Sequence, residues 1–225
     1  MIVCSQQFAV RIASIVLALY SLALPSSAQN GQGDDFDYWA LTLSWSPTFC
    51  ETEAGRNNRQ QCGPGRRFAF VVHGLWPPYE QGWPQNCETG ERYVPDSLID
   101  AMTDIMPSKG LIIHEWRKHG TCSGMSQKAY FALTRALFER ITIPARYIEP
   151  NNYMLTDPQT MRHDFLATNR WLSTEGMAIQ CGNRRDRANL SEVRICFDLD
   201  LKPRACGANE RRQCRAQQLV LPPVR

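Results

Sequence analysis

Three of the chain's four histidines lie in two short segments that also carry charged and aromatic residues. His73 begins the segment HGLWP, and His114 and His119 lie in the segment HEWRKHGTC. An imidazole has an ordinary pKa of about 6.5, so it can take or give a proton near neutral pH. One isolated histidine would more often be a buried structural residue, but three in these contexts indicate acid–base chemistry.

The spacing within the second segment disfavours a zinc site. A helical HExxH motif places two histidines one turn apart, whereas His119 comes one residue later than that motif requires. At about 100° per residue, His114 and His119 are expected to diverge by roughly 140° around a helix. The pairs that align are His114 with Lys118 and Glu115 with His119. Cations beside one carboxylate suit an anionic substrate such as a phosphate, so we expect neither a metal ion nor another cofactor.

Cleavage of RNA without a metal needs the groups that these segments supply. One group must take the proton of the 2′-hydroxyl, and another must give a proton to the departing 5′-oxygen. Histidine can perform both tasks, and His73 would add its imidazole to the second segment. A positive cluster would stabilise the negative charge that develops on five-coordinate phosphorus.

In this order, the two segments closely resemble the active-site segments of the ribonuclease T2 family. The resemblance extends over most of the chain through Trp45-Ser46-Pro47 with Cys50, through Asn86-Cys87, and through the late cysteines. It implies an α+β fold and a metal-independent endoribonuclease. The implied reaction on single-stranded RNA yields a 2′,3′-cyclic phosphate and then a 3′-phosphate end.

The resemblance also implies roles for four catalytic residues. His119 matches the general base of the family, and His73 matches its general acid. Glu115 and Lys118 match residues that stabilise the phosphorane-like state. Because an idle relative would be free to lose these residues, they argue against the alternative of a catalytically inactive RNA-binding or toxin-like protein.

Two further residues match substrate-binding positions. The resemblance implies that His114 helps to bind phosphate and that Trp76 packs near the nucleotide, although a tryptophan of the core fits the sequence equally well. Some members carry an acidic residue at the position of Pro78 that helps to read adenine. Proline cannot do this, so no base preference is predicted.

The chain begins with a predicted signal peptide. Arg11 precedes a mostly apolar run, residues 12–24, and small residues follow up to Ala28. This run is too short to span a bilayer comfortably, since about 20 apolar residues are needed. We therefore expect residues 1–28 to be removed and residues 29–225 to form one soluble catalytic domain, secreted or periplasmic.

The cysteines support export. Cys4 lies in the predicted leader, and an even number in the remaining chain indicates disulfides, whereas no CxxC pair suggests a thiolate metal site. These cysteines are Cys50, Cys62, Cys87, Cys122, Cys181, Cys196, Cys206 and Cys214. The resemblance implies the pairs Cys87–Cys122, Cys50–Cys62, and Cys181–Cys214 nested around Cys196–Cys206.

The net charge of +3, or +2 without Arg11 of the leader, is too mild to indicate nucleic-acid binding by itself. We interpret the arginine clusters as solvated loops. His163 is expected on a helix surface, and Asn189 begins a glycosylation sequon. RNA is the expected partner of a monomer that needs no obligate protein partner. The clustered arginines are Arg184, Arg185, Arg187, Arg211, Arg212 and Arg215.

The elements that must position these residues follow from hydrophobic periodicity and turn residues. Helices in mid-chain between early and late strands indicate an α+β domain with a mostly antiparallel sheet. A loop is expected at 51–67 and an irregular tail at the end. Strands are predicted at 36–45, 68–72 (with His73 at its end), 177–181 and 193–199. Helices are predicted from 96 to Pro107, at 112–119, from the Ser126 cap to Pro144, and at 158–168.

Overall fold

The computed structural model describes residue 1 and residues 35–225. The predicted signal peptide and its cleavage after Ala28 therefore lie outside the described residues. Among residues 35–225, no helix combines the length and the apolar character needed to cross a membrane.

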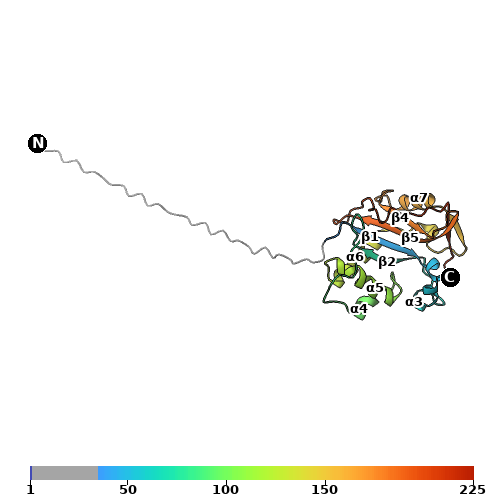
Figure 1. The fold of residues 1–225 in the computed structure, drawn as a ribbon, viewed down its shortest axis with the longest axis horizontal. Coiled ribbons are helices and arrows are strands. Elements are labelled where there is room, and N and C mark those ends of the chain that lie inside the picture. Colours follow the sequence, from blue (N-terminus) through green and yellow to red (C-terminus); the bar gives the residue numbers. More distant parts are fainter. Residues whose placement is uncertain (2–34) are drawn as a thin grey trace. The chain divides into compact units, whose positions relative to one another are not determined.

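A six-stranded sheet organises the described residues (Figure 1). Its strands run in the order β2-β1-β5-β6-β3, and β4 pairs with β5 beside this path. Every pairing is antiparallel except that of β5 with β6. The fold is thus the predicted single α+β domain with a mostly antiparallel sheet. The strands are β1 (Trp39–Trp45), β2 (Phe70–Trp76), β3 (Met154–Thr156), β4 (Met177–Cys181), β5 (Arg187–Phe197) and β6 (Gln218–Leu221).

In Figure 1, α4, α5 and α6 are drawn below the strands and α7 above them. The buried apolar residues of α5, α6 and α7 belong to one hydrophobic core, which they share with alternating residues of β1 and β5. Helices α5 and α6 contact β2, and α7 contacts β4. The α-helices are α1 (Ser46–Cys50), α2 (Glu53–Arg56), α3 (Arg59–Cys62), α4 (Asp96–Asp100), α5 (Lys109–Lys118), α6 (Gln127–Glu139) and α7 (Pro158–Thr168). Two 3₁₀ turns are η1 (Gly120–Cys122) and η2 (Ala145–Tyr147).

Side-chain caps explain why two of the helices begin where the sequence predicts. The side chain of Ser126 accepts a hydrogen bond from the amide of Ala129 at the start of α6. Asp157 accepts from the amides of Gln159 and Thr160 at the start of α7. Each cap satisfies amides that a helix leaves without an internal partner.

Several predicted elements differ from the structure. The expected loop at 51–67 contains α2 and α3, which the side chains of Thr52 and Asn58 cap. The helix expected up to Pro107 ends at Asp100. A turn follows, in which the amide of Met102 donates a hydrogen bond to the carbonyl of Ile99, three residues earlier. The tail is not wholly irregular, because its residues 218–220 pair in parallel with 187–189 of β5.

Strand β5 is the centre of the sheet and alternates in burial. Val193, Ile195 and Phe197 are fully buried, while the half-buried Glu192 and Arg194 face the opposite way. The predicted continuation to Leu199 is wrong. The strand ends at Phe197 because a turn follows, and Leu199 is 55% exposed.

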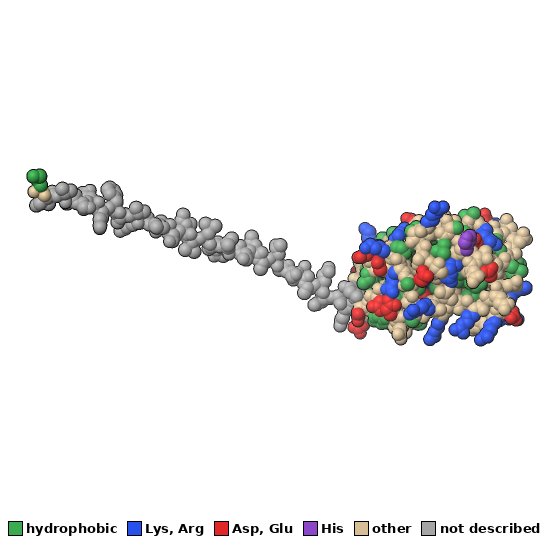
Figure 2. Space-filling model, turned by 90° about the horizontal axis from the view of Figure 1, so that it is seen from above, with side chains coloured by type: hydrophobic (Ala, Val, Ile, Leu, Met, Phe, Trp, Pro, Cys, Tyr) green, Lys and Arg blue, Asp and Glu red, His purple; other side chains and the backbone are tan. Residues whose placement is uncertain are grey.

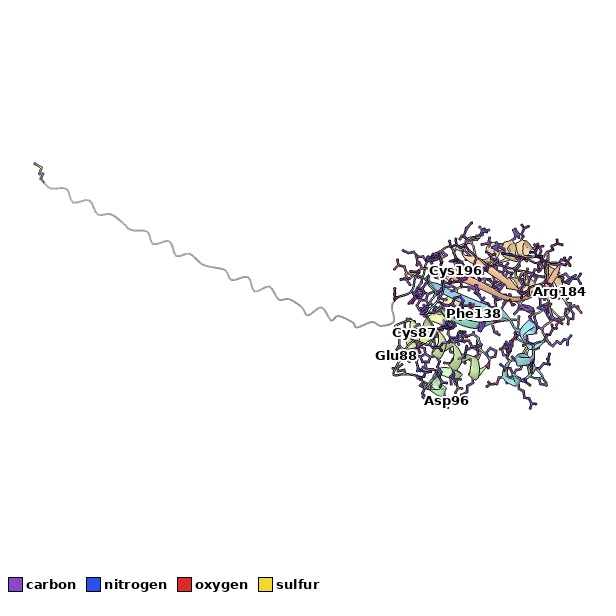
Figure 3. All side chains as sticks on the ribbon, in the orientation of Figure 1. Cys87, Glu88, Asp96, Phe138, Arg184 and Cys196 are labelled. Atoms are coloured by element: carbon purple, nitrogen blue, oxygen red, sulfur yellow. A yellow bond between two sulfur atoms is a disulfide. The ribbon has the colours of Figure 1, made fainter. Side chains whose placement is uncertain are left out.

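Four disulfides join the described chain, and they coincide with the pairs that the resemblance implied. Two of them attach the C-terminal segment to β4 and β5. Figure 3 shows Cys196 on the sheet and Cys87 on the loop beside α5 and α6. The pairs are Cys50–Cys62, Cys87–Cys122, Cys181–Cys214 and Cys196–Cys206.

Candidate active site

His73 is presented by an irregularity in the sheet. It was expected at the end of a strand, but β2 continues to Trp76 because its pairing with β1 continues. The register shifts between Thr42 and Leu43, which pair with Gly74 and Val72, so His73 has no partner on β1. A β-bulge of this kind redirects a side chain, and it turns His73 out of the sheet's regular alternation.

The second motif lies on α5 and at its end. Helix α5 stops at Lys118, and His119 leaves the helical conformation with φ −120° and ψ −48°. Gly120 allows this ending, because a side chain at that position would collide with the ring of Trp116. His114 and His119 were predicted to diverge, yet both line one pocket, since His119 is no longer part of the helix.

This pocket brings all six sequence-predicted site residues together. Its volume is about 310 Å³, and it opens between β2, β5 and α5. It is lined by His73, Trp76, Pro78, Trp83, His114, Glu115, Lys118, His119, Glu192, Arg194 and Glu210.

His73 lies between two carboxylates. Its Nδ1–H donates to Glu192 Oε1 at 2.7 Å, and its Nε2 is 3.6 Å from Glu115 Oε1. Burial lowers the pKa of His73, but the hydrogen bond to Glu192 and the charges of both carboxylates outweigh burial. The net result is a pKa raised above 6.5, which favours the protonated imidazole.

His119 has the opposite tendency. Burial, followed by the positive charges of Lys118, His73 and His114, lowers its pKa from 6.5 to about 3. Among the described residues, the buried Nδ1 of His119 has no hydrogen-bond partner. Burial and Lys118 also lower the pKa of His114. The pocket therefore holds a neutral imidazole and a protonated one over the same range of pH.

Glu115 is held from two sides although its side chain is almost completely buried. Its Oε2 accepts a hydrogen bond from Trp76 Nε1 at 2.8 Å. Burial raises its pKa above 4.5, against the lowering influence of His73 and Trp76. A side chain at Gly74 would collide with this carboxylate, so the glycine leaves the space that Glu115 occupies.

Trp76 lies close to both imidazoles. Its ring is 5.5 Å from the ring of His73 and 5.2 Å from that of His119. The guanidinium of Arg194 lies over the indole at 4.6 Å, a favourable cation–π distance. Trp76 is only partly buried, so it is a wall of the pocket and not a residue of the core.

The sequence reasoning missed four residues of the pocket, which are Glu192, Arg194, Glu210 and Trp83. Arg194 is 2.8 Å from Glu192 Oε2 and 3.6 Å from Glu210 Oε1, so it joins a half-buried carboxylate to a buried one. Tyr38 donates a hydrogen bond to Glu210. The fourth missed residue, Trp83, is 52% exposed. Alternation is a signal that could have found Arg194, which lies on the polar face of the predicted strand at 193–199. Glu192 lies one residue before that prediction, on the same face of β5 as Arg194.

Other predicted features lie away from the pocket. The side chain of His163 on α7 is 83% exposed, as expected for a surface residue. Asn189 lies on β5, where its side-chain amide donates to Glu51 at 3.2 Å. Within residues 35–225, no group of three or more His, Cys, Asp and Glu side chains is arranged to hold a metal ion.

Comparisons with known proteins find similar sequences among ribonucleases. A sequence profile described as the ribonuclease T2 family matches residues 36–206. A ribonuclease of Aeromonas hydrophila is 42% identical over 136 residues, which cover 59% of this chain and 60% of that protein. A probable ribonuclease of Haemophilus influenzae is 30% identical over 174 residues, covering 72% of this chain and 58% of that protein. The chain thus spans less than two thirds of the length of these relatives.

Solved structures show the same fold. An RNase-related protein from Calystegia sepium superposes with a TM-score of 0.66 at 24% identity, and the match covers 84% of this chain and 98% of that one.

Proposed function

The chain belongs to the ribonuclease T2 family, and from this membership we propose that it is a secreted endoribonuclease that cleaves single-stranded RNA without a metal. One observation carries the proposal. Two imidazoles with opposite pKa shifts, His73 and His119, line a single pocket with Lys118 and Glu115. Acid–base cleavage of a phosphodiester needs one neutral and one protonated group at the same time.

In the first step, the neutral imidazole of His119 takes the proton of the 2′-hydroxyl. The oxygen then attacks phosphorus, and the bond from phosphorus to the 5′-oxygen breaks. The imidazolium of His73 gives its proton to that oxygen, so the products are a 2′,3′-cyclic phosphate and a 5′-hydroxyl. In the second step, water attacks the cyclic phosphate with the two roles exchanged, and a 3′-phosphate results.

The other residues act on charge and position. Lys118 stabilises the negative oxygens of the five-coordinate phosphorus. Glu115, whose Oε1 is 3.6 Å from Nε2 of His73, stabilises the protonated form of that imidazole. His114 lies at the rim of the pocket and would contact a phosphate oxygen. The partly exposed indole of Trp76 offers a surface for a nucleotide base.

Export is part of the proposal. Residues 1–28 have the charge, apolar run and small residues of a signal peptide. The four disulfides support an oxidising compartment, either the periplasm or the extracellular medium.

The proposal is tested by incubating the purified chain with single-stranded RNA in excess EDTA. We expect cleavage, with cyclic-phosphate ends appearing before 3′-phosphate ends. Cleavage that EDTA abolishes would point to a metal-dependent hydrolase, and no cleavage under any condition would point to an idle relative.

Substitutions test the two imidazoles. We expect His119→Ala and His73→Ala each to lower kcat by about 10²–10⁴-fold, the usual contribution of a general acid or base. The exposed His163→Ala is the matched control and should retain full activity. Circular dichroism and thermal melting would establish that the variants remain folded. Near-normal turnover in either active-site variant would show that its assigned role is wrong.

A further inference from the structure

Two arginine-bearing segments, 184–187 and 211–215, form one surface although they are separate in the sequence. The Cys181–Cys214 disulfide joins their flanks. The amide of Gln217 donates to the carbonyl of Arg185 at 2.8 Å, and the amide of Cys214 donates to that of Ile179 at 2.7 Å. The arginines are exposed, as the prediction of solvated loops implies, and the fold holds the two segments against each other.

The surface contains a groove of about 440 Å³ lined by four arginines, which we call the arginine groove: Arg184, Arg185, Arg212 and Arg215. All four are exposed, and Arg184 lies at the edge of the molecule in Figure 3. A second groove of about 1010 Å³ shares Arg184 and adds Arg187.

These arginines form no ion pair in the described part of the chain, because none of the four has a carboxylate oxygen within 4.0 Å, although Asp186 follows Arg185 in the sequence. The face drawn in Figure 2 carries both positive and negative side chains. Guanidinium groups bind phosphate oxygens through two parallel hydrogen bonds. A cluster of exposed guanidiniums on two segments that are held together therefore suits a polymer of phosphates better than a single small anion.

The arginine groove adjoins the candidate active site. Gln180 lines the groove, and its side-chain amide donates to the carbonyl of Glu210, which lines the active-site pocket, at 3.3 Å. Gln180 also lies opposite Glu192 in the pairing of β4 with β5. Arg187, which lines the second groove beside Arg184, is roughly 17 Å from Glu192 along β5, given about 3.3 Å per residue. One extended polymer can therefore reach both places.

We propose that the arginine groove is an exosite for the phosphate backbone of single-stranded RNA, several nucleotides from the scissile phosphodiester. The proposal rests on the proposed function, because it takes the polymer in the groove to be the substrate. Contacts to phosphates carry no sequence information, so the exosite increases affinity for long RNA without setting base preference.

The test compares the fourfold variant Arg184→Ala/Arg185→Ala/Arg212→Ala/Arg215→Ala with a matched control. The control, Arg59→Ala/Arg66→Ala/Lys128→Ala/Arg170→Ala, removes the same charge from exposed positions outside both sites. Each full-length protein is assayed on a dinucleoside monophosphate and on single-stranded RNA of about twenty nucleotides, longer than a typical single-strand site.

We expect the groove variant to lose at least about tenfold in kcat/KM on the long RNA, because each lost phosphate contact weakens binding. Its kcat/KM on the dinucleoside should not change. The slope of log kcat/KM against log salt should become shallower by roughly 3, or about 0.7 for each of the lost contacts. An equal loss on both substrates, or the same loss in the control variant, would overturn the proposal.

Binding of 2′-O-methyl RNA separates this proposal from the proposed function, because that RNA lacks the attacking hydroxyl. Weaker binding by the groove variant supports the exosite even if the chain cleaves no RNA, in which case the proposed function alone fails. Unchanged RNA binding overturns the exosite whatever the cleavage result. A variant that loses binding to heparin but keeps RNA binding would assign the groove to anionic glycans and would also overturn the proposal.

Discussion

At the scale of single residues, the geometry around His73 makes one carboxylate a positioning residue. Glu192 accepts the Nδ1 proton of His73 at 2.7 Å, so the Nε2 atom is directed toward Glu115. The same contact helps to raise the pKa of His73. Glu192 would thus act on the reaction through the imidazole and not by touching the substrate.

This position predicts a particular pH dependence. The rate should rise as His119 loses its proton, below pH 6.5, and fall as His73 loses its proton, above pH 6.5. In Glu192→Gln the raising influence of the carboxylate is lost, so the alkaline limb should move to lower pH while the acid limb stays in place. The measurement is the pH profile of kcat/KM on a dinucleoside.

The exposed Glu149→Gln is the control for loss of one carboxylate, and its profile should match that of the parent. A Glu192→Gln profile that drops evenly at every pH would indicate a structural role only and would refute the positioning role.

Gly74 gives a second prediction at this scale. In Gly74→Ala the new methyl group would displace the Glu115 carboxylate, which cannot retreat because it is buried. A displacement of about 1 Å in an active site can cost about 100-fold in rate, so we expect a loss of that order in kcat. Gly90→Ala is the control, since a methyl group there meets no atom within 4 Å. Normal kcat in Gly74→Ala would show that the exact place of Glu115 is unimportant.

At the scale of elements, local sequence signals predicted some parts of the molecule well. The bounds of α7 and β4 agree with the prediction, because a cap, periodicity and flanking residues are all local. The β2 bulge that presents His73 could not be predicted, since it depends on pairing with a strand about 30 residues away in the sequence. For the same reason Glu192 was missed as a partner of His73. The six candidate residues were found from motifs, and their catalytic roles stay predictions.

The Cys87–Cys122 disulfide should matter for activity because it fixes the end of α5. Cys122 lies in η1 directly after His119, and the amide of Asn86 donates to the carbonyl of Lys118 at 2.8 Å. We expect Cys87→Ser/Cys122→Ser to lower kcat by at least about tenfold, as small displacements of catalytic groups do. It should also lower the free energy of unfolding by roughly 2–4 kcal/mol. Steady-state kinetics and denaturant unfolding measure the two effects.

Cys50→Ser/Cys62→Ser serves as the comparison, because that disulfide closes a 12-residue separation away from the pocket. It should reduce stability but leave kcat unchanged. Equal losses of kcat in the two double variants would mean that the α5 end is not held by its disulfide.

At the scale of the whole molecule, the disulfides and the core share the task of stability. Two crosslinks have sequence separations of 35 and 33 residues, and two have separations of 12 and 10. In the chain-entropy description, a disulfide that closes a longer loop restricts the unfolded chain more. Cys181–Cys214 and Cys196–Cys206 also attach the last part of the chain, including Glu210 and the arginine groove, to the central strands.

Reduction of all four disulfides should therefore destabilise the entire domain. At roughly 2–4 kcal/mol each, their combined contribution is comparable with the roughly 5–15 kcal/mol of a typical domain. We expect a large fall in Tm when the protein is fully reduced and alkylated, measured by circular dichroism against an untreated sample. The apolar core around Trp45 and Phe197 is extensive, so residual secondary structure should persist at low temperature. An unchanged Tm would mean that the core alone sustains the fold and that the crosslinks serve only to hold the α5 end and the arginine groove in place.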